Sequence, residues 1–567
     1  MAIPRPEHPF PQFQRKDWLS LNGPWEFEID NARSGRDRRF QDRAHLDSTI
    51  LVPFCPESAL SGVGNTDFMN AVWYQRTLTI PDQWEGKRVY LQFGAVDHHT
   101  EVYLNGGLVC VHDGGYTPFS ADITDRLQPG ENRLTVYAED DVRSPRQPRG
   151  KQSEWYASHG CDYTRVTGIW QTVWLEARPE IHIEQVRYEP DINNACLHLW
   201  ARVRGGATLT AEAFYEGRPV GRAEAVSTGG TARLCLPLDE LHLWEAGQGR
   251  LYDLRLTYGD DRADSYFGMR QVRLDGHRFL LNGKSVFQRT VLDQGYYPDG
   301  IYTAPNERAL IRDIELSLAA GFNGARLHQK VFEPRYLYHC DRLGYLVWGE
   351  YGSWGIDLSD RGAAEPLLGS WMEEIQRDYN HPSVIGWCPL NETWDYDGRP
   401  QCNEILRLLY QVTKEMDPTR PCIDTSGNFH VVTDIFDVHD YDQNPASFKE
   451  KYDRLMTEGV LHDPFSNRQT YRGEAVFLSE YGGIRWSERP GEGWGYGEGP
   501  QTPEEFLERY RGLTDALLDN DRLFGFCYTQ LYDVEQEQNG LYTYDRRPKF
   551  DMDFFRKVNG RKAAIED

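Results

Sequence analysis

The chain of 567 residues is constrained most by a regular alternation of helical and short apolar segments after about residue 275. Helical patterns cover 306–320, 401–416 and 503–520, and short apolar runs lie between and around them. Alternation of this kind over 275–567 predicts a parallel sheet covered by helices, and its length fits one (β/α)8 barrel. The runs that we predict as barrel strands are 325–327, 345–348, 384–388, 435–438, 475–478 and 524–526.

Polar side chains stand at or just after the ends of these predicted strands. In a barrel of this kind the strand ends meet at one face, which is the face that carries the active site. Glu392 and Glu480 each follow an apolar run, where the solvated surface position that is usual for a glutamate is disfavoured. The strand-end residues that we expect around one opening are Arg326, His328, Glu350, Asn391, Glu392, His439, Asp440 and Glu480.

Two glutamates at one opening can cleave a glycosidic bond. One carboxyl group protonates the leaving oxygen while the other meets the oxocarbenium ion that develops on the sugar. If the carboxyl groups lie about 5 Å apart, the second attacks the anomeric carbon directly and the configuration is retained. The sequence therefore predicts catalysis by Glu392 and Glu480.

Before residue 275 the pattern is that of β-sheet without long helical stretches. In 1–178 short alternating runs recur between turn signals, and Asn105-Gly106-Gly107 predicts a hairpin turn. We expect this part to form a jelly-roll β-sandwich. Strands at regular intervals continue over 179–274 and predict a small immunoglobulin-like sandwich. The chain is thus expected to hold three domains, 1–178, 179–274 and 275–567.

Charge and composition disfavour several classes of protein. A net charge of −25 argues against a nucleic-acid partner, whose phosphates require a clustered basic face. No window approaches the roughly 18 uninterrupted apolar residues of a membrane-spanning helix, and the N-terminus carries no apolar leader. The ten cysteines form no C-x-x-C pair, which favours reduced thiols over disulfides or a zinc site. We therefore expect a cytoplasmic protein without a membrane or nucleic-acid partner.

Both glutamates lie in longer segments of distinctive sequence. Glu392 closes the segment 380–392, Glu480 lies in 479–483, and further such segments are 18–27, 112–119, 162–170 and 540–549. Together these segments resemble glycoside hydrolase family 2, whose members include β-galactosidases, β-glucuronidases and β-mannosidases. The resemblance extends over nearly the whole chain and implies a sugar-binding domain ahead of a catalytic barrel.

The resemblance implies a role for each of five residues. Glu392 would be the general acid and base, and Glu480 the nucleophile. Asn391 would hydrogen-bond the 2-hydroxyl of the sugar, an interaction that strengthens in the transition state. Asp162 matches an aspartate that the N-terminal domain sends into the pocket to hold a distal hydroxyl. Arg326 matches an arginine that orients the nucleophile side, although a structural ion pair within the barrel is an equal alternative.

Further contacts are predicted around this centre. The family places a tyrosine after strand six that donates a hydrogen bond to the nucleophile, and Tyr441 offers one at a shorter offset. His439 could contact substrate or form a structural pair with Asp440. Asp293 stands where the family often has sugar ligands, as does Gln294. The glycine-rich loop 485–499 has the composition of a lid, and Trp486 within it is a candidate for stacking on sugar, with lid packing as the alternative.

Departures from the family pattern bear on the substrate. The family's glucuronidases bind the sugar carboxylate with an Asn-x-Lys motif just before the closing segment, whereas this chain has two glutamates and no lysine in 535–540. A carboxylate-bearing substrate would meet repulsion, so we expect a neutral sugar and β-galactosidase-type activity. The family's large β-galactosidases bind magnesium through a histidine shortly after the third-strand acid. The sequence after Glu350 has no such histidine, so we expect no catalytic metal and no other cofactor.

Other interpretations of the chain remain open at this point. A β-glucuronidase or β-mannosidase of the same family would keep the chemistry and change the sugar. A non-catalytic carbohydrate-binding protein would keep the barrel without turnover, although both glutamates are present in their motifs. In each case the partner is an oligosaccharide or another glycoside. A homo-oligomer is compatible with the family, but the sequence does not fix it.

Overall fold

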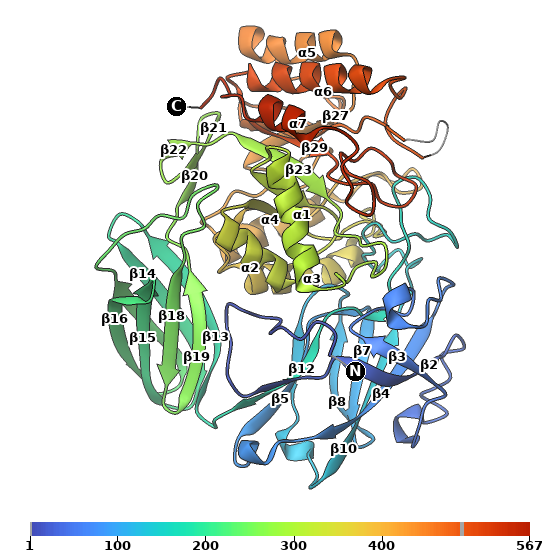
Figure 1. Cartoon of the computed structure of the whole chain (residues 1–567), viewed down its shortest axis with the longest axis vertical. Coiled ribbons are helices and arrows are strands. Elements are labelled where there is room, and N and C mark those ends of the chain that lie inside the picture. The colour runs from blue at the N-terminus through green and yellow to red at the C-terminus, as the bar shows by residue number, and fades with distance from the viewer. Residues whose placement is uncertain (1–2, 488–492, 567) are drawn as a thin grey trace.

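The computed structural model describes residues 3–487 and 493–566, which form three units along the chain (Figure 1). The first unit, blue in Figure 1, is a sandwich of two antiparallel sheets with strand orders β3-β2-β4-β10-β7-β8 and β1-β12-β5-β9. Its strands are β1 (Trp18–Ser20), β2 (Gly23–Ile29), β3 (Ser48–Val52), β4 (Ala71–Thr79), β5 (Arg88–Phe93), β7 (His99–Leu104), β8 (Gly107–Asp113), β9 (Phe119–Asp122), β10 (Glu131–Glu139) and β12 (Val173–Arg178), with the short pair β6 (Val96–Asp97) and β11 (Gly168–Ile169).

Alternating burial explains why these segments form a sandwich. In β5 and β7 every second residue is buried, as expected for strands with one face on a core. Val89, Leu91 and Phe93 of β5 enter the hydrophobic cluster of this unit. The predicted turn is confirmed, because Asn105 and Gly106 both have the positive φ that a two-residue hairpin needs.

The second unit, green in Figure 1, is a smaller β-sandwich, as the sequence predicts. Its sheets have strand orders β13-β14-β17 and β16-β15-β18-β19, and Leu199, Leu209 and Leu256 lie in the cluster that they share. Its strands are β13 (His182–Asp191), β14 (Cys196–Arg204), β15 (Ala207–Tyr215), β16 (Arg218–Ser227), β17 (Gly230–Pro237), β18 (Tyr252–Tyr258) and β19 (Asp261–Phe267).

The third unit is a parallel sheet that confirms the predicted barrel, with strand order β26-β25-β24-β23-β29-β28-β27. Residues 422–426 occupy the remaining position as an irregular strand, since Ile423 N donates to Trp387 O and Ser426 N donates to Leu390 O. The Ser426 hydroxyl donates in turn to Asp437 of β27. The barrel strands are β23 (Gln288–Asp293), β24 (Gly324–Leu327), β25 (Leu346–Glu350), β26 (Val384–Cys388), β27 (Ile435–Asp440), β28 (Ala475–Gly482) and β29 (Leu523–Thr529), preceded by β20 (Val272–Asp275), β21 (Arg278–Leu281) and β22 (Lys284–Ser285).

Helices surround the barrel, and the three predicted ones are confirmed as α1, α4 and α6. Two of these begin at capping residues, because Asn306 accepts from Ala309 N and Thr502 accepts from Glu505 N. Among the described residues, no helix is both long and apolar enough to span a membrane. The helices are α1 (Glu307–Ala319), α2 (Pro334–Leu343), α3 (Ala364–Asp378), α4 (Asn403–Met416), α5 (Pro445–Glu458), α6 (Pro503–Leu518) and α7 (Met552–Asn559).

Buried polar contacts fix the three units against one another. Arg15 bonds Glu176 of the first unit and Asp261 of the second, each at 2.8 Å. Arg187 of the second unit donates to the Tyr379 hydroxyl of the barrel at 2.9 Å. Because buried charges are costly unless they are paired, such contacts specify one arrangement of the units.

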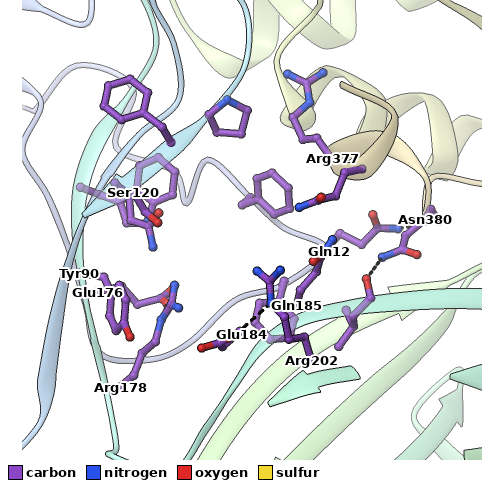
Figure 2. Close-up of a pocket in the computed structure, with 18 of the residues that line it drawn as sticks. Gln12, Tyr90, Ser120, Glu176, Arg178, Glu184, Gln185, Arg202, Arg377 and Asn380 are labelled. Atoms are coloured by element: carbon purple, nitrogen blue, oxygen red, sulfur yellow. Dashed lines mark hydrogen bonds and ion pairs between the residues drawn. The ribbon is translucent and has the colours of Figure 1, made fainter. Parts of the chain in front are cut away.

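A cleft of about 400 Å³ lies where the three units meet (Figure 2). In this view Tyr90, Glu176 and Arg178 lie on one side of it, and Arg377 and Asn380 of the barrel lie on the other. Its lining includes none of the strand-end residues predicted for catalysis. The cleft is therefore a seam between units, and the candidate site lies elsewhere.

Candidate active site

Glu392 and Glu480 come together at the carboxyl ends of the barrel strands. Glu480 lies on β28 with its side chain 4% exposed, whereas Glu392 follows β26 and its side chain is 21% exposed. One carboxylate oxygen of each and a ring nitrogen of His439 lie within 4.8 Å of one another. This spacing suits attack by one carboxylate on a sugar whose leaving oxygen the other protonates.

The carboxylate of Glu480 is held in its ionised form. Arg326 Nη1 donates to its Oε1 at 3.1 Å, and the Tyr441 hydroxyl donates to its Oε2, as the family resemblance implies. Burial alone would raise the pKa of Glu480, but the charges of His439 and Arg326 lower it to about 2. An ionised carboxylate at neutral pH is the state that a nucleophile requires.

Two roles were predicted for Arg326, a structural ion pair within the barrel and the orientation of the nucleophile. Its contacts are compatible with both, because it forms a buried ion pair with Glu350 and also contacts Glu480. Its Nη2 donates to Glu350 Oε2 at 2.6 Å and to Asn391 Oδ1 at 2.9 Å. Asn391 Nδ2 is buried and has no acceptor among the residues that the structure describes. Since a buried amide donor normally has a partner, this group is suited to bind a sugar hydroxyl.

His439 bridges the two glutamates. Its Nδ1 lies 2.8 Å from Glu392 Oε1 and 3.5 Å from Glu480 Oε2, while Nε2 lies 3.0 Å from the Ser426 hydroxyl. A Cβ on Gly427 would lie 2.6 Å from Nδ1, so a glycine is needed beside the ring. The alternative prediction, a structural pair of His439 with Asp440, is wrong, because Asp440 forms an ion pair with Lys451 instead.

Replacing His439 with asparagine is expected to move the acid limb of kcat/KM to higher pH. Burial alone would lower the pKa of His439, but the charges of Glu480 and Glu392 raise it above its usual value and so favour the charged ring. Its loss removes a charge that lowers the pKa of Glu480, and activity then disappears at a higher pH as the pH falls. We would compare pH profiles with those of D440N as the matched control. An acid limb equal to that of the wild type would contradict this assignment.

A loop of the first unit closes one side of the opening. Arg149 N donates to Trp354 O at 2.7 Å, and Gly150 N donates to Gly352 O at 3.2 Å, so the loop is bonded to the segment after β25. A Cβ on Gly150 would lie 2.2 Å from Gln329 O, and only glycine permits this approach.

This loop presents charged side chains to the barrel. Asp162 Oδ1 accepts from Arg149 Nη1 at 2.7 Å, and the Asp162 side chain is 13% exposed. Lys151 Nζ lies 3.7 Å from the centroid of the Trp354 ring, and Trp354 Nε1 donates to Asn391 O at 3.0 Å. Asp162 therefore lies in the same segment that supplies Lys151 to the catalytic side of the barrel. Neither Lys151 nor Arg149 was predicted as a site residue from the sequence, and the adjacent Gly150 was the local signal for this close approach.

Aromatic side chains line the same opening, but not as predicted. The Tyr441 ring stacks on Tyr496 at 3.4 Å between centroids, and Trp494 lies 5.0 Å from Tyr496. The Trp486 ring instead packs on Phe550 at 5.7 Å, so the sugar-stacking role predicted for Trp486 is replaced by lid packing. Residues 488–492 of the predicted lid 485–499 lie outside the described residues.

Asp293 was predicted to bind the sugar, but its contacts contradict this role. It is 1% exposed and accepts hydrogen bonds from the Tyr532 hydroxyl, the Tyr336 hydroxyl and Gly295 N. Its oxygens are thus satisfied inside the barrel wall, which leaves it a structural residue. Gln294 is also buried, and its Oε1 has no donor among the described residues.

The two glutamates of the 535–540 segment differ in position. Glu535 accepts from Thr164 N and so faces the first unit. Glu537 is 2% exposed, and its oxygens accept from the Tyr163 hydroxyl at 2.5 Å and from Asn539 Nδ2 at 2.9 Å. Burial, the largest cause, raises the pKa of Glu537, and Lys151 opposes this rise. Of the two carboxylates expected to repel a negatively charged substrate, Glu535 is turned toward the first unit. Glu537 remains, and the charge of Lys151 acts on it.

Three groups of residues are close enough to share a metal ion among the described part of the chain. In the first, Glu392, His439 and Glu480 already bond one another in the catalytic centre. In the second, Arg149 pairs with both carboxylates, which opposes a cation there. The third lies on strands β14 and β17 of the second unit, away from the barrel. The full sets are Glu392, His439, Glu480; Glu154, His159, Asp162; and Cys196, His198, Cys235.

A (β/α)8 barrel with two unequal glutamates at its mouth, and a β-sandwich loop against them, defines a glycosidase-type site. Two models of one family match the chain: the sugar binding domain of the glycosyl hydrolases family 2 over 18–179, and its TIM barrel domain over 272–484. The chain belongs to glycoside hydrolase family 2, and it is a glycoside hydrolase.

Relatives match the chain over almost its whole length. It is 24% identical to a β-glucuronidase of Paenibacillus borealis, over 93% of this chain and 94% of the relative. It is 26% identical to a β-glucuronidase of Felis catus, over 95% of this chain and 89% of the relative. Among solved structures, a β-glucuronidase of Faecalibacterium prausnitzii has a TM-score of 0.80 and 25% identity, covering 96% of this chain and 98% of that chain.

Proposed function

We propose that the chain is a retaining exo-β-glycosidase in which Glu480 is the nucleophile and Glu392 the general acid and base. The observation that carries this proposal is the pairing of the two carboxylates within 4.8 Å in unequal environments. Glu480 is buried among Arg326, His439 and Tyr441, while Glu392 is the more exposed of the two. Groups that differ in this way suit the two different roles of the mechanism.

The reaction proceeds by two displacements. The Glu480 carboxylate attacks the anomeric carbon and forms a glycosyl ester while the Glu392 carboxyl group protonates the departing glycosidic oxygen. The Glu392 carboxylate then takes a proton from water, and the oxygen of that water attacks the anomeric carbon and releases Glu480. Each inversion reverses the other, so the released sugar keeps the β configuration.

Neighbouring residues would hold the sugar for these steps. The unpartnered Nδ2 of Asn391 is placed to donate to the 2-hydroxyl. Asp162 would accept from a distal hydroxyl, with Arg149 fixing its orientation at 2.7 Å. Tyr441 and Arg326 keep the attacking carboxylate in place through their hydrogen bonds. Positioning of this kind lowers the barrier without any further chemical group.

For the sugar, we propose a β-D-glucuronide. The relatives support it, because β-glucuronidases match the chain over nearly its whole length. The electrostatic objection is weaker than the sequence indicated, because Glu535 faces Thr164 and Lys151 lies near Glu537. A carboxylate on the substrate would therefore be attracted by Lys151 as well as repelled by Glu537.

A neutral β-galactoside is the second candidate. The observation that favours it is Glu537, a buried carboxylate in the segment where the family's glucuronidases carry Asn-x-Lys. Asn539 in the same segment is uncharged and would suit hydroxyl recognition. This candidate keeps Glu392 and Glu480 in the same roles and changes the sugar, which carries a hydroxymethyl group in place of the carboxylate at carbon 5 and has the opposite configuration at carbon 4.

A panel of 4-nitrophenyl glycosides tests the substrate. It comprises the β-D-glucuronide, β-D-galactoside, β-D-mannoside, β-D-fucoside and α-L-arabinoside. We expect the highest kcat/KM for the glucuronide, because only this sugar offers an anion to Lys151. A higher kcat/KM for the galactoside would reject the glucuronide and favour the neutral candidate, while leaving the two-glutamate chemistry intact.

A further inference from the structure

The loop that carries Lys151 is held rigidly at the mouth of the barrel. Residues on either side of Lys151 are tied down, because Arg149 N and Gly150 N bond to the carbonyls of Trp354 and Gly352. The carbonyl of Lys151 itself accepts from Tyr163 N at 2.7 Å. Lys151 is 5% exposed, so neighbouring residues and not water surround its side chain.

The ammonium group of Lys151 lies over the Trp354 ring, whose Nε1 bonds the carbonyl of Asn391. It is also close enough to Glu537 and Glu392 for their charges to raise its pKa. The hydroxyl of Tyr163 donates to the same Glu537. A cation in this place is next to both the catalytic segment and the segment 535–540.

Lys151 differs from Arg326 and Arg149 in the partner of its charge, which is the ring of Trp354 and not a carboxylate. Arg326 pairs with Glu350 and Glu480, and Arg149 pairs with Glu154 and Asp162. For Lys151, no hydrogen bond or ion pair to another side chain is found within the part of the chain that the structure describes. Charges buried in proteins are normally paired, so an unpaired one in a substrate pocket points to a partner on the substrate.

The group is charged under ordinary conditions. Burial alone would lower the pKa of Lys151, but the nearby Cys161, Glu537 and Glu392 raise it above its usual value. The oxygens of Glu537 are meanwhile occupied by Tyr163 and Asn539. Lys151 therefore keeps its ammonium hydrogens available for another acceptor.

We propose that Lys151 of the first unit is the residue that binds the carboxylate of the sugar, in place of a lysine in the barrel. The proposal rests on the proposed function, because it requires a glucuronide as substrate. It explains how the chain could accept a uronic acid although the segment 535–540 contains no lysine. A charge-assisted hydrogen bond of this kind is short and strong in a water-poor pocket.

The test uses two substrates that differ only at carbon 6. 4-Nitrophenyl β-D-glucuronide carries a carboxylate there, and 4-nitrophenyl β-D-glucoside carries a hydroxymethyl group. For the Lys151→Met variant we expect the ratio of the two kcat/KM values to fall by about tenfold or more. K151R keeps the charge and is expected to retain most of the ratio. Because a ratio is measured, a general loss of activity does not imitate the result.

Lys330 offers a matched control for the loss of a buried lysine. It is 4% exposed and donates to the carbonyls of Gly295 and Tyr302, so K330M removes a buried amino group with a structural role. Its ratio of kcat/KM values should equal that of the wild type. Thermal unfolding of each variant identifies loss of fold.

Inhibition supplies a second measurement that does not depend on turnover. D-Glucaro-1,5-lactone and D-glucono-1,5-lactone differ at the same carbon, and K151M should weaken inhibition by the first more than by the second. If the wild type prefers the glucuronide and neither ratio changes in K151M, the role of Lys151 is wrong and the proposed function stands. If the wild type does not hydrolyse the glucuronide, the proposed substrate fails and the role of Lys151 fails with it.

Discussion

Replacing Glu480 with glutamine is expected to lower kcat for the preferred aryl glycoside by about 10⁴-fold or more. The amide has nearly the same shape and can still accept a hydrogen bond from Tyr441, but it cannot form a glycosyl ester. It also removes the negative charge that stabilises the oxocarbenium ion. The measurement is steady-state release of 4-nitrophenol, with thermal unfolding to show that E480Q is folded.

Residual turnover decides whether the assignment holds. Glu458 provides a matched control, because it is an exposed glutamate of α5 whose one ion pair among residues 3–487 and 493–566 is with Arg454 at 3.0 Å. E458Q should retain wild-type kcat, since exposed ion pairs contribute little. If E480Q turned over within tenfold of the wild type, Glu480 would not be the nucleophile.

Replacing Glu392 with alanine is expected to slow turnover by about 10²–10⁴-fold, in a way that depends on the leaving group. The 2,4-dinitrophenolate leaving group departs without a proton. Formation of the glycosyl ester from a 2,4-dinitrophenyl glycoside should therefore be slowed much less than from a 4-nitrophenyl glycoside. The second step should be slow for both, because water has lost its base. Sodium azide should restore turnover of the dinitrophenyl substrate and give a β-glycosyl azide, since azide attacks without a base.

The azide product separates an acid and base from a structural residue. Product analysis by mass spectrometry and NMR would identify the β-glycosyl azide from E392A. Equal losses for both leaving groups, with no azide product, would mean that Glu392 supports the fold or the binding of sugar and does not transfer protons. E458Q again serves as the variant without effect.

The barrel and its catalytic pair could be predicted because both depend on local pattern. Apolar runs specify buried parallel strands, and polar residues at their ends must meet at one face. Glu392 and Glu480 followed from this rule, and so did the position of Arg326. Residues 422–426 escaped the prediction because Asp424, Thr425 and Ser426 are polar, so this strand has no continuous apolar run.

Contacts between distant segments could not be predicted in the same way. Lys151 meets Trp354 only because the first unit docks on the barrel and Gly150 permits the close approach. The family resemblance implies a sugar ligand after the first barrel strand, where Asp293 stands, yet the Tyr532 hydroxyl donates to its carboxylate. A strand-end position specifies the face of the barrel, but not whether neighbouring donors already satisfy the side chain.

The structure also changes the electrostatic argument about the substrate. Counting Glu535 and Glu537 gave two negative charges near the sugar, but the fold turns Glu535 toward Thr164. The charge that remains is accompanied by Lys151, which is far away in sequence. Local electrostatics depend on distances in three dimensions, and a sequence supplies these only along the chain.

The most direct test of the central claim is the configuration of the first-formed sugar. ¹H NMR spectra recorded during the first minutes of hydrolysis of the preferred aryl β-glycoside distinguish the two anomeric protons. Attack by Glu480 followed by attack of water inverts the carbon twice, so the β-anomer should appear first and the α-anomer only later, through mutarotation. If the α-anomer appeared first, water would attack the substrate directly, and the nucleophilic role of Glu480 would be wrong.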